Sequence, residues 1–477
     1  MTAERTRSKI VCTIGPASRS EEVLAGMIEA GMDVARINFS HATHDIARET
    51  FERIRKVDDT VAILFDLQGP KIRIGEMKQP VELESGASFI LSIDDFVGDE
   101  TRVSISHKEL PDDVKKGDTI AINDGIVILR VEEVGKTDVQ TKVISGGPIS
   151  SRKGVNIPGI RLSCHLPTEK DVKDLDIAAE LEPDFIALSF VLDANDIKRV
   201  NEIIEGNGPK NVDIISKIEH MLAVKNYDEI LKASHGVMIA RGDLGIEVPM
   251  EDVPVLQRDL VRKANVWARP AIVATHMLES MTHERIPTRA EVSDVAHAIF
   301  DRADAVMLSA ETAMGHDPVG AVAMMERIIR RAEKKITPVN PLDITSEERY
   351  IVEIVGNLVY SAVTLLPEKI DGIITATRSG FTARWLSKFR PPADIYAVAS
   401  EAAVMRRLRI LWGVQPVRYE HDINNVDDLV RESVRAVHSL GYIEVDKDIV
   451  FTSGIRHIPS RTNILGIFHV EDLLLNV

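Results

Sequence analysis

The chain has little of what builds disulfide-bonded or membrane-embedded proteins. It contains two cysteines in 477 residues, Cys12 and Cys164, which are too few for a disulfide framework. Such usage is typical of a reducing compartment, so we expect a cytoplasmic protein. No run of about 18 apolar residues occurs, and the charged start leads straight into a strand-like run. We therefore expect neither a membrane-spanning helix nor a secretory signal.

Aromatic residues and positive charge are also scarce. Aromatics make up 4% of the chain and are scattered, so no stacking surface for nucleic-acid bases is predicted. Acidic residues outnumber basic ones by 74 to 58, and the net charge of −16 argues against nucleic-acid or anionic-membrane partners. Hydrophobic residues still make up 44%, which is enough to bury substantial cores. The length suggests about three domains.

Short β-branched and apolar runs alternate with helix-length amphipathic stretches. The eight runs span residues 9–14, 33–39, 61–67, 185–190, 212–218, 236–240, 271–275 and 305–309. This alternation predicts an α/β fold built on a (β/α)₈ TIM barrel. An open doubly wound sheet is the alternative, but no Gly-x-Gly-x-x-Gly pattern follows the first run. Helix starts are expected at Ser18, with Glu21 completing a capping box, near Thr43, at Pro167-Thr168 and at Asp317-Pro318.

Two segments break this rhythm. Between about 70 and 164, alternating patterns punctuated by glycines predict a small all-β insertion. It leaves from the end of the third strand, where barrel loops carry function, so we expect it to act as a lid. Behind a polar linker, PVNPLDITSEE, the α/β pattern restarts. The expected domains are a catalytic barrel (1–69 and 165–336), a lid (70–164) and a C-terminal α/β domain (337–477).

Polar residues gather where the predicted barrel strands end, which is the face that holds active sites in such barrels. They are Arg36, Asn38, Ser40, Asp66, Lys217, Glu219, Asp243, Thr275, Ser309 and Glu311. Lys217 and Glu219 are two apart and share a strand face, although alone they are equally explained as a structural ion pair. With Asp243 they suit a hard divalent cation such as Mg²⁺ that bridges to a phosphate. Arg36 and Arg73 suit a clamp on phosphoryl oxygens, the alternative being surface charges.

The chain resembles the pyruvate kinases from end to end. The matching stretches include KIVCTIGPAS (9–18), DVARINFSH (33–41), DLQGPKIR (66–73), ISKIE (215–219), MIARGDLGIE (238–247), ATHMLESM (274–281) and DAVMLSAETAMG (304–315). The resemblance implies a phosphotransferase that moves the phosphoryl group of phosphoenolpyruvate to ADP, giving ATP and pyruvate in the last step of glycolysis. It also implies dependence on Mg²⁺ or Mn²⁺.

The resemblance further implies how substrate and metal are bound. Glu219 and Asp243 would hold the metal ion. Lys217 would neutralise the transferring phosphoryl group, and Arg36 would bind it. Gly242 and Asp243 would offer backbone N–H groups to the substrate carboxylate.

Further roles follow from the same resemblance. Thr275 would belong to the network that protonates the enolate carbon, with Ser309 and Glu311 as supporting members. The residues that would contact nucleotide phosphates are His41, Arg73 and, on the insertion, Lys153. The insertion would close over the nucleotide and limit access of water.

One departure from the family bears on K⁺. Many members need this ion, held by residues that match Asn38, Ser40, Asp66 and Leu67. Where those members often have a glutamate in the stretch DLQGPKIR, this chain has Lys71. A fixed ammonium supplies a similar charge, so we expect activity without K⁺. The alternative is that Lys71 points away and K⁺ still binds.

A second motif lies in the C-terminal domain. Thr377, Arg378, Ser379, Gly380 and Thr382 fall between a predicted strand and a helix. Hydroxyls and a glycine at a helix N-terminus suit a phosphate, although a plain helix cap needs only one of the hydroxyls. In the family this loop holds phosphorylated effectors, so we expect activation by a sugar phosphate or a nucleoside monophosphate. The family is usually homotetrameric, and we expect the same here.

Smaller departures lie beside the implied catalytic positions. They are Ala42, His220 and His276, where the family commonly has Gly, Asn or Gly, and Gln. Two other functions would account for part of this pattern. A Mg²⁺-dependent lyase or aldolase would use the same lysine and carboxylates but would need neither the insertion nor ADP. A non-catalytic sensor is expected to have lost those groups, and all of them are present.

Overall fold

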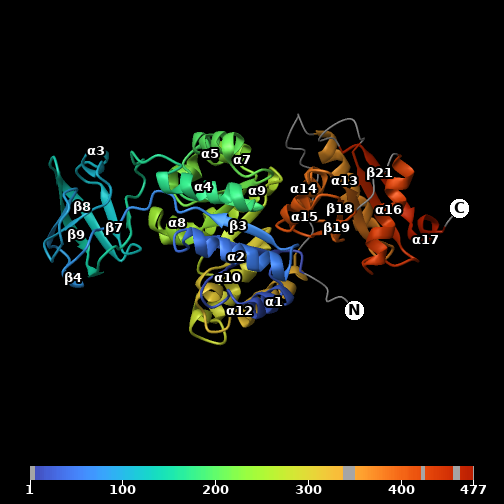
Figure 1. Cartoon of the computed structure of the whole chain (residues 1–477), viewed down its shortest axis with the longest axis horizontal. Helices are drawn as coiled ribbons and strands as arrows, with labels where there is room; N and C mark the ends of the chain where they lie inside the picture. The colour runs from blue at the N-terminus through green and yellow to red at the C-terminus, as the bar shows by residue number, and fades with distance from the viewer. Residues whose placement is uncertain (1–5, 337–349, 420–424, 455–461, 476–477) are drawn as a thin grey trace.

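A computed structural model describes residues 6–336, 350–419, 425–454 and 462–475. A closed barrel occupies the middle of the molecule, with an all-β unit at one end and an α/β unit at the other (Figure 1). The predicted linker PVNPLDITSEE lies outside the described residues. None of the helices in the described ranges is both long and apolar enough to cross a bilayer.

All eight predicted barrel strands form, and they are parallel. They are β1 (Lys9–Thr13), β2 (Val34–Asn38), β3 (Ala62–Asp66), β12 (Phe185–Leu188), β13 (Asp213–Ile218), β14 (Gly236–Ala240), β15 (Ala271–Ala274) and β16 (Ala305–Leu308). Strand β16 pairs with β1 and closes the ring. The predicted (β/α)₈ barrel is therefore confirmed, and the open sheet is excluded.

Helices surround the barrel. They are α1 (Glu21–Glu29), α2 (His44–Val57), α4 (Glu169–Leu181), α5 (Ala194–Asn207), α6 (Met221–Lys225), α7 (Tyr227–Ala233), α8 (Arg241–Glu247), α9 (Val253–Val266), α10 (Arg289–Phe300), α11 (Ala310–Ala313) and α12 (Pro318–Glu333), with short 3₁₀ turns at Met250–Asp252 and Glu279–Thr282. The starts predicted at Thr43, Thr168 and Asp317 are N-caps. The capping box at Ser18 was wrong. Ser20 caps α1, because the Ser18 hydroxyl already accepts from Gly15 N in the preceding turn at 3.0 Å.

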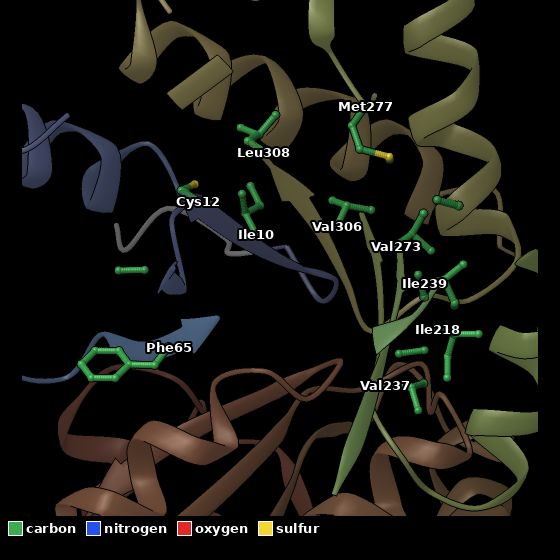
Figure 2. Close-up of a cluster of buried hydrophobic side chains, with 14 of the residues drawn as sticks. Ile10, Cys12, Phe65, Ile218, Val237, Ile239, Val273, Met277, Val306 and Leu308 are labelled. Carbon is green, nitrogen blue, oxygen red and sulfur yellow. The ribbon is translucent and has the colours of Figure 1, made fainter. Parts of the chain in front are cut away.

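Successive side chains of a β-strand point to opposite sides, so along each barrel strand they alternate between the barrel interior and the helix layer. Ile10 and Cys12 of β1 belong with Val273 and Val306 to the layer between strands and helices (Figure 2). The intervening residues form the apolar filling of the interior, which includes Val11, Val34, Leu64 and Ile215. Two residues further along the same four inward rows come Thr13, Arg36, Asp66 and Lys217. The alternation thus places a polar layer over an apolar plug at the carboxyl ends of the strands.

The insertion between β3 and α4 has its own core. Its strands are β4 (Val81–Leu83), β5 (Ser88–Ser92), β6 (Arg102–Ser104), β7 (Thr119–Ile122), β8 (Val127–Val134), β9 (Asp138–Ser145), β10 (Gly147–Ile149) and β11 (Val155–Asn156), with one short helix α3 (Leu110–Asp113). Strands β11-β7-β8-β9-β5-β6 form one sheet, and β10 pairs with β4. Phe89, Leu129 and Val139 are fully buried among them. We refer to this unit as the lid.

The C-terminal unit covers the other end of the barrel. Its sheet has the order β19-β18-β17-β20-β21 and is flanked by helices. The elements are α13 (Tyr350–Leu365), β17 (Ile370–Ala376), α14 (Phe381–Lys388), β18 (Ile395–Ala399), α15 (Ala402–Leu408), β19 (Val414–Arg418), α16 (Val426–Ser439), β20 (Asp448–Ser453), β21 (Ile464–His469) and α17 (Val470–Leu474). Lys9 Nζ donates to Val414 O at 3.0 Å, and Arg390 pairs with Asp304 at 2.9 Å. Buried polar contacts therefore join the amino-terminal end of the barrel to this unit.

Candidate active site

Four charged side chains meet inside the mouth of the barrel, where β2, β3 and β13 end. Arg36 Nε donates to Asp66 Oδ2 at 2.7 Å, and Lys217 Nζ lies 3.3 Å from Asp66 Oδ1 and 3.0 Å from Glu219 Oε1. No side chain of the four is more than 12% exposed. Burial raises the pKa of Asp66, but the charges of Arg36 and Lys217 outweigh it and hold that pKa below its ordinary value. Burial likewise opposes the charge of Lys217, yet the Asp66 and Glu219 carboxylates raise its pKa overall. The array therefore fixes two cations at the mouth.

A third carboxylate, that of Asp243, stands beside this array. Burial and the charge of Asp243, opposed by Lys217, raise the pKa of Glu219 to about 7. The other oxygen of Glu219 accepts from Phe190 N at 2.8 Å, which fixes the carboxylate. Asp243 lies in the first turn of α8, directly after β14, and is half-buried. Within the described ranges no group of three or more His, Cys, Asp or Glu side chains is placed to hold a metal. A cation here would depend on Glu219 and Asp243 together with oxygens of a substrate.

The loop after β15 holds Thr275 in a strained conformation. Thr275 and His276 have φ angles of 67° and 54°, in the left-handed region that side chains with a Cβ rarely adopt. Arg241 Nη2 donates to Thr275 O at 2.6 Å, and its Nη1 donates to Asp294 Oδ1 at 2.8 Å. The Thr275 hydroxyl accepts from Gly242 N at 2.8 Å. The N–H group that the resemblance assigns to a substrate carboxylate is thus bonded to Thr275 in this structure.

Glu311 fixes the turn after β16. It is 1% exposed and accepts from Ser309 N at 2.6 Å and from Leu278 N at 3.0 Å, so it ties this turn to the Thr275 loop. Burial raises the pKa of Glu311. The Ser309 hydroxyl is buried and has no hydrogen-bond partner in the described part of the chain. It is therefore free to bond a ligand or a water at the mouth.

The base of the lid brings Arg73 and Lys153 together. The chain enters and leaves the lid side by side: Arg73 pairs with Gly154, and Ile74 N donates to Lys153 O at 3.0 Å. Arg73 Nη1 donates to Arg152 O at 2.8 Å, which restrains the guanidinium. Two cations from opposite ends of the insertion therefore stand on neighbouring segments.

His41 lies close to several cations. It follows β2 and is exposed at the rim of the mouth. Partial burial of its ring and the nearby charges of Lys71, Arg36 and Arg73 lower the pKa of His41. This side of the mouth is therefore electropositive, which suits a polyphosphate.

The sequence and the structure both match one known family. Residues 5–322 match the model for the pyruvate kinase barrel domain, and residues 354–468 match the model for the pyruvate kinase alpha/beta domain. The chain is 41% identical to a pyruvate kinase of Thermococcus litoralis, over 97% of this chain and 98% of that protein. A pyruvate kinase of Geobacillus stearothermophilus is 40% identical over 98% of this chain and 81% of its own length. A crystal structure of a pyruvate kinase from Cryptosporidium parvum superposes with a TM-score of 0.90 at 34% identity, covering 98% of this chain and 96% of that one.

The chain belongs to the pyruvate kinase family. Its members are phosphotransferases and generally depend on Mg²⁺, so the resemblance found in the sequence is confirmed at the level of the family. The fold expected from it, a barrel with a β insertion and a C-terminal α/β unit, is confirmed as well.

In this pyruvate kinase family member, protein groups already bond oxygens of three of the four monovalent-cation positions. Asn38 Oδ1 accepts from Ser40 N at 3.0 Å. The carbonyl of Leu67 accepts from the Ser189 hydroxyl at 2.7 Å. Asp66, the fourth position, is bonded to Arg36 at 2.7 Å. Lys71 is exposed and has no hydrogen bond or ion pair to any described residue.

The C-terminal loop begins where β17 ends. Thr377 Oγ1 accepts from Gly380 N at 3.0 Å, and Gly380 has a φ of 79° that suits glycine. Arg378 and Ser379 are exposed between them. Thr382 lies in the first turn of α14, buried, and shares a 2.7 Å hydrogen bond with Thr462. No side chain caps α14, so the plain helix-cap explanation for these hydroxyls fails.

The loop stands at the point where the sheet order reverses. From β17 the chain continues to β18 and β19 on one side, while β20 pairs with β17 on the other. Such reversals leave a crevice at the carboxyl ends of the strands. Three buried hydroxyls at these ends, Thr375, Thr452 and Ser453, have no hydrogen-bond partner in the described part of the chain.

Three residues of the site were given no role from the sequence. Ser189 accepts from Lys217 Nζ at 2.8 Å, and Thr13 accepts from Arg36 Nη1 at 2.8 Å. Both stand at barrel strand ends, so the same strand-end rule applied to every strand would have found them. Arg241, which restrains Thr275, lies inside the quoted stretch MIARGDLGIE, but nothing in the sequence tells where its guanidinium points.

Proposed function

We propose that this chain transfers the phosphoryl group of phosphoenolpyruvate to ADP, giving ATP and pyruvate in the last step of glycolysis. The single observation that carries the proposal is the buried array of Arg36, Asp66, Lys217 and Glu219 with Asp243 beside it. Phosphoryl transfer spreads negative charge over several oxygens, so its catalysis is mostly positioning and cationic stabilisation. Two fixed cations in a site with little water supply both.

Within this proposal Arg36 and Lys217 bind the phosphoryl group. Asp66 holds both cations at hydrogen-bond distance, so neither has to reorganise when charge develops. Arg36 presents a planar fork to two oxygens, whereas Lys217 acts as a point charge on the transferring group.

Glu219 and Asp243 are the residues that would hold Mg²⁺ or Mn²⁺. The fit rests on their chemistry: two oxygen donors lie close enough that the charge of Asp243 helps to raise the pKa of Glu219. A divalent cation relieves that repulsion and needs only one or two carboxylates when substrate oxygens complete its shell. When bound, the cation neutralises charge on the phosphoryl oxygens.

Thr275, Ser309 and Glu311 form the other side of the proposed site. The Ser309 hydroxyl has no hydrogen-bond partner among the described residues, and Glu311 accepts from Ser309 N and Leu278 N, which ties the turn after β16 to the Thr275 loop. Thr275 would belong to the network that protonates the enolate carbon, with Ser309 and Glu311 as supporting members. Gly242 would release its bond to Thr275 and, with Asp243, offer N–H groups to the substrate carboxylate.

The nucleotide would bind between barrel and lid. Arg73 and Lys153 stand at the base of the lid and His41 at the rim of the mouth, all on the electropositive side. We propose that residues 70–164 move as one body over a barrel of 1–69 and 165–336, with 337–477 as the effector domain. The separate core of the lid supports this division.

The experiment is a pyruvate-formation assay with phosphoenolpyruvate, ADP and Mg²⁺, repeated without ADP and without Mg²⁺. Turnover that needs both components supports the kinase, whereas pyruvate formation independent of ADP supports the lyase. Asp243→Asn is expected to lower kcat at least about 100-fold, because it removes the negative charge of one of the two proposed metal ligands. Asp252→Asn, which changes an exposed carboxylate nearby, serves as the control and should leave kcat within about twofold.

We propose that turnover does not require K⁺. Arg36 and Ser189 donate to oxygens of the monovalent positions, and the Lys71 charge acts on the same side of the mouth. Lys71→Glu is expected to create a K⁺ requirement, whereas Lys116→Glu, the same charge change on an exposed lid residue, is not. Wild-type turnover that stays negligible until K⁺ is added would defeat this part of the proposal.

We also propose that a phosphorylated effector binds loop 377–382. The unpartnered hydroxyls at the sheet reversal and the exposed Ser379 support it. Ser379→Ala combined with Thr382→Ala should abolish activation by a sugar bisphosphate or a nucleoside monophosphate. Ser379→Ala alone avoids disturbing the buried Thr382, and full activation in both variants argues against the loop.

A cytoplasmic homotetramer completes the proposal. Apolar side chains that a monomer would leave in water support an assembly: Leu358 and Leu365 of α13 are 54% and 77% exposed, and Ile467 of the edge strand β21 is 52% exposed. Light scattering on the purified chain measures the mass directly.

A further inference from the structure

The lid returns to the barrel across the mouth. Residues 157–168, here called the return segment, lead from β11 to α4. The segment runs beside a cavity of about 370 Å³ whose walls come from the lid, at Asp124, and from the barrel, at Phe190, Asp243 and Glu247. Its contacts with the barrel therefore help to set how the lid sits over the site.

His220 holds the return segment from the end of β13. Its Nδ1 accepts from Leu222 N at 3.0 Å as the N-cap of α6, which places the ring proton on Nε2. That Nε2–H faces Ile160 O at 3.2 Å and Glu247 Oε2 at 3.3 Å. The ring side chain is 10% exposed, so these bonds are largely shielded from water.

Glu247 holds the neighbouring residue of the same segment. Its Oε2 accepts from Gly159 N at 3.0 Å, and its side chain is 3% exposed. Gly159 has a φ of 75°, a left-handed turn that directs this N–H to the barrel. Consecutive lid residues are thus bonded to two barrel side chains that also contact each other.

Both holding residues belong to the segments that carry the proposed metal ligands. His220 follows Glu219 directly, and Glu247 lies one helical turn after Asp243 on α8. The same helix meets the lid a second time: a Cβ on Gly125, in the turn between β7 and β8, would lie 3.8 Å from Ile246 Cγ2. The barrel residues that contact the lid and the proposed metal ligands therefore lie on the same two segments, the end of β13 and α8.

We propose that His220 and Glu247 form a latch that holds Gly159–Ile160 of the lid and so positions Lys153 for the nucleotide. They are positioning residues, which act on the nucleotide through Lys153 of the lid. The proposal rests on the proposed function for its kinetic consequence alone. Lys153 belongs to the lid, whereas Arg36 and Lys217 belong to the barrel. Loosening the latch therefore raises KM for ADP and leaves KM for phosphoenolpyruvate unchanged.

Two variants of His220 separate its two roles. His220→Asn keeps an acceptor near the Nδ1 position, so it still caps α6 but does not reach Ile160. His220→Gln keeps a donor near the Nε2 position and loses the cap. The matched control is His235→Asn at the opposite end of the barrel, because His235 Nδ1 accepts from Ile214 N at 3.0 Å in the same manner.

Cys164 reports the latch without any substrate. It lies in the return segment, lines the cavity and is half-buried, whereas Cys12 is fully buried. The rate at which a thiol reagent labels native protein then follows opening of the segment. His220→Asn is expected to label about tenfold faster than wild type, the effect of losing about one buried hydrogen bond, while His220→Gln and His235→Asn stay within about twofold.

The kinetic arm uses the same proteins. His220→Asn should raise KM for ADP about tenfold and leave KM for phosphoenolpyruvate within about twofold of wild type. Glu247→Gln keeps an acceptor for Gly159 N, so its KM for ADP should lie between those of His220→Asn and wild type. Equal labelling of His220→Asn and wild type would overturn the latch, as would loosening in His220→Gln as large as in His220→Asn. If His220→Asn does not fold, Glu247→Gln decides by the same two readouts. Labelling needs no turnover, so it tests the latch even if the proposed reaction fails.

Discussion

An ion pair at the foot of β13 lends itself to a quantitative test. Asp213, the first residue of β13, accepts from Arg384 of α14 at 3.2 Å and lies 3.8 Å from Arg407 of α15. The Asp213 and Arg384 side chains are 16% and 20% exposed. Neighbouring His235 does not compete for the charge, because burial lowers its pKa below the ordinary value. The pair joins α14, which begins within loop 377–382, to β13, the strand that carries Lys217.

The expected energy follows from the distance and the exposure. At 3.2 Å and an effective dielectric constant of about 20, direct attraction is about 5 kcal/mol. Desolvation of both groups and residual solvent offset most of it, which leaves a coupling of about 1–2 kcal/mol. Asp213→Asn is expected to cost more, about 2–3 kcal/mol in free energy of unfolding, because Arg384 and Arg407 then face each other without a counter-charge.

A double-mutant cycle measures the coupling. Asp213→Asn, Arg384→Met and the double variant are unfolded in urea, and the coupling is the difference between the double change and the sum of the single changes. Asp228 and Lys263 form the matched control: their atoms are 3.3 Å apart, but the side chains are 63% and 53% exposed. That pair should couple by less than about 0.5 kcal/mol. Equal coupling in the two pairs would refute the argument from burial.

Two further predictions concern packing and pH. A Cβ at Gly15 would lie 2.5 Å from Ala313 O, so Gly15→Ala should displace α11, lower the free energy of unfolding by about 1–3 kcal/mol and lower kcat. A Cβ at Gly206 would have no atom within 4 Å, so Gly206→Ala is the control and should change neither stability nor kcat. Unchanged thermal unfolding of Gly15→Ala would contradict this prediction. Burial raises the pKa of Asp113 in the lid, but the hydrogen bonds from Ser163 and the hydrogen bond and charge of His107 together outweigh it, so its folded pKa lies below the ordinary value. The stability that the Asp113 carboxylate contributes is therefore present above about pH 4 and is lost as the pH falls through the folded pKa. Asp113→Asn should destabilise the lid by about 1–2 kcal/mol at pH 7 and by less below pH 4, measured by denaturation curves. A loss of stability that is equal at the two pH values counts against the prediction.

The fold was predictable because its signals are local. Barrel strands are buried on both faces and read as short continuous apolar runs, and the lid strands alternate instead. The strand-end rule then located Lys217, Glu219 and Asp243 without any contact information. The error at Ser18 is of the same local kind: two serines compete for one cap, and the Gly15 turn decides between them.

Other parts of the site could not be predicted, because they depend on where side chains point. The strand-end rule can find Ser189 as a position, but the sequence does not show that its hydroxyl bridges Lys217 and Leu67. His220 stands out as a departure from the family, yet its contact with Ile160 joins residues 60 apart. Such contacts form only in the folded protein, where the return segment contacts the end of β13 and α8.

The ring of the barrel also sets an order of events during synthesis. Lys9 of β1 pairs with Ala305 of β16, so the first strand lacks one neighbour until the last is made. At about 5–20 residues per second, the ribosome needs roughly 15–60 s to cover that interval. The fully buried members of the lid core, by contrast, all lie within residues 72–157, so this core can condense soon after they emerge. A nascent chain therefore carries a finished domain on an unfinished one, and its unpaired strand edges are the surfaces that chaperones would have to shield.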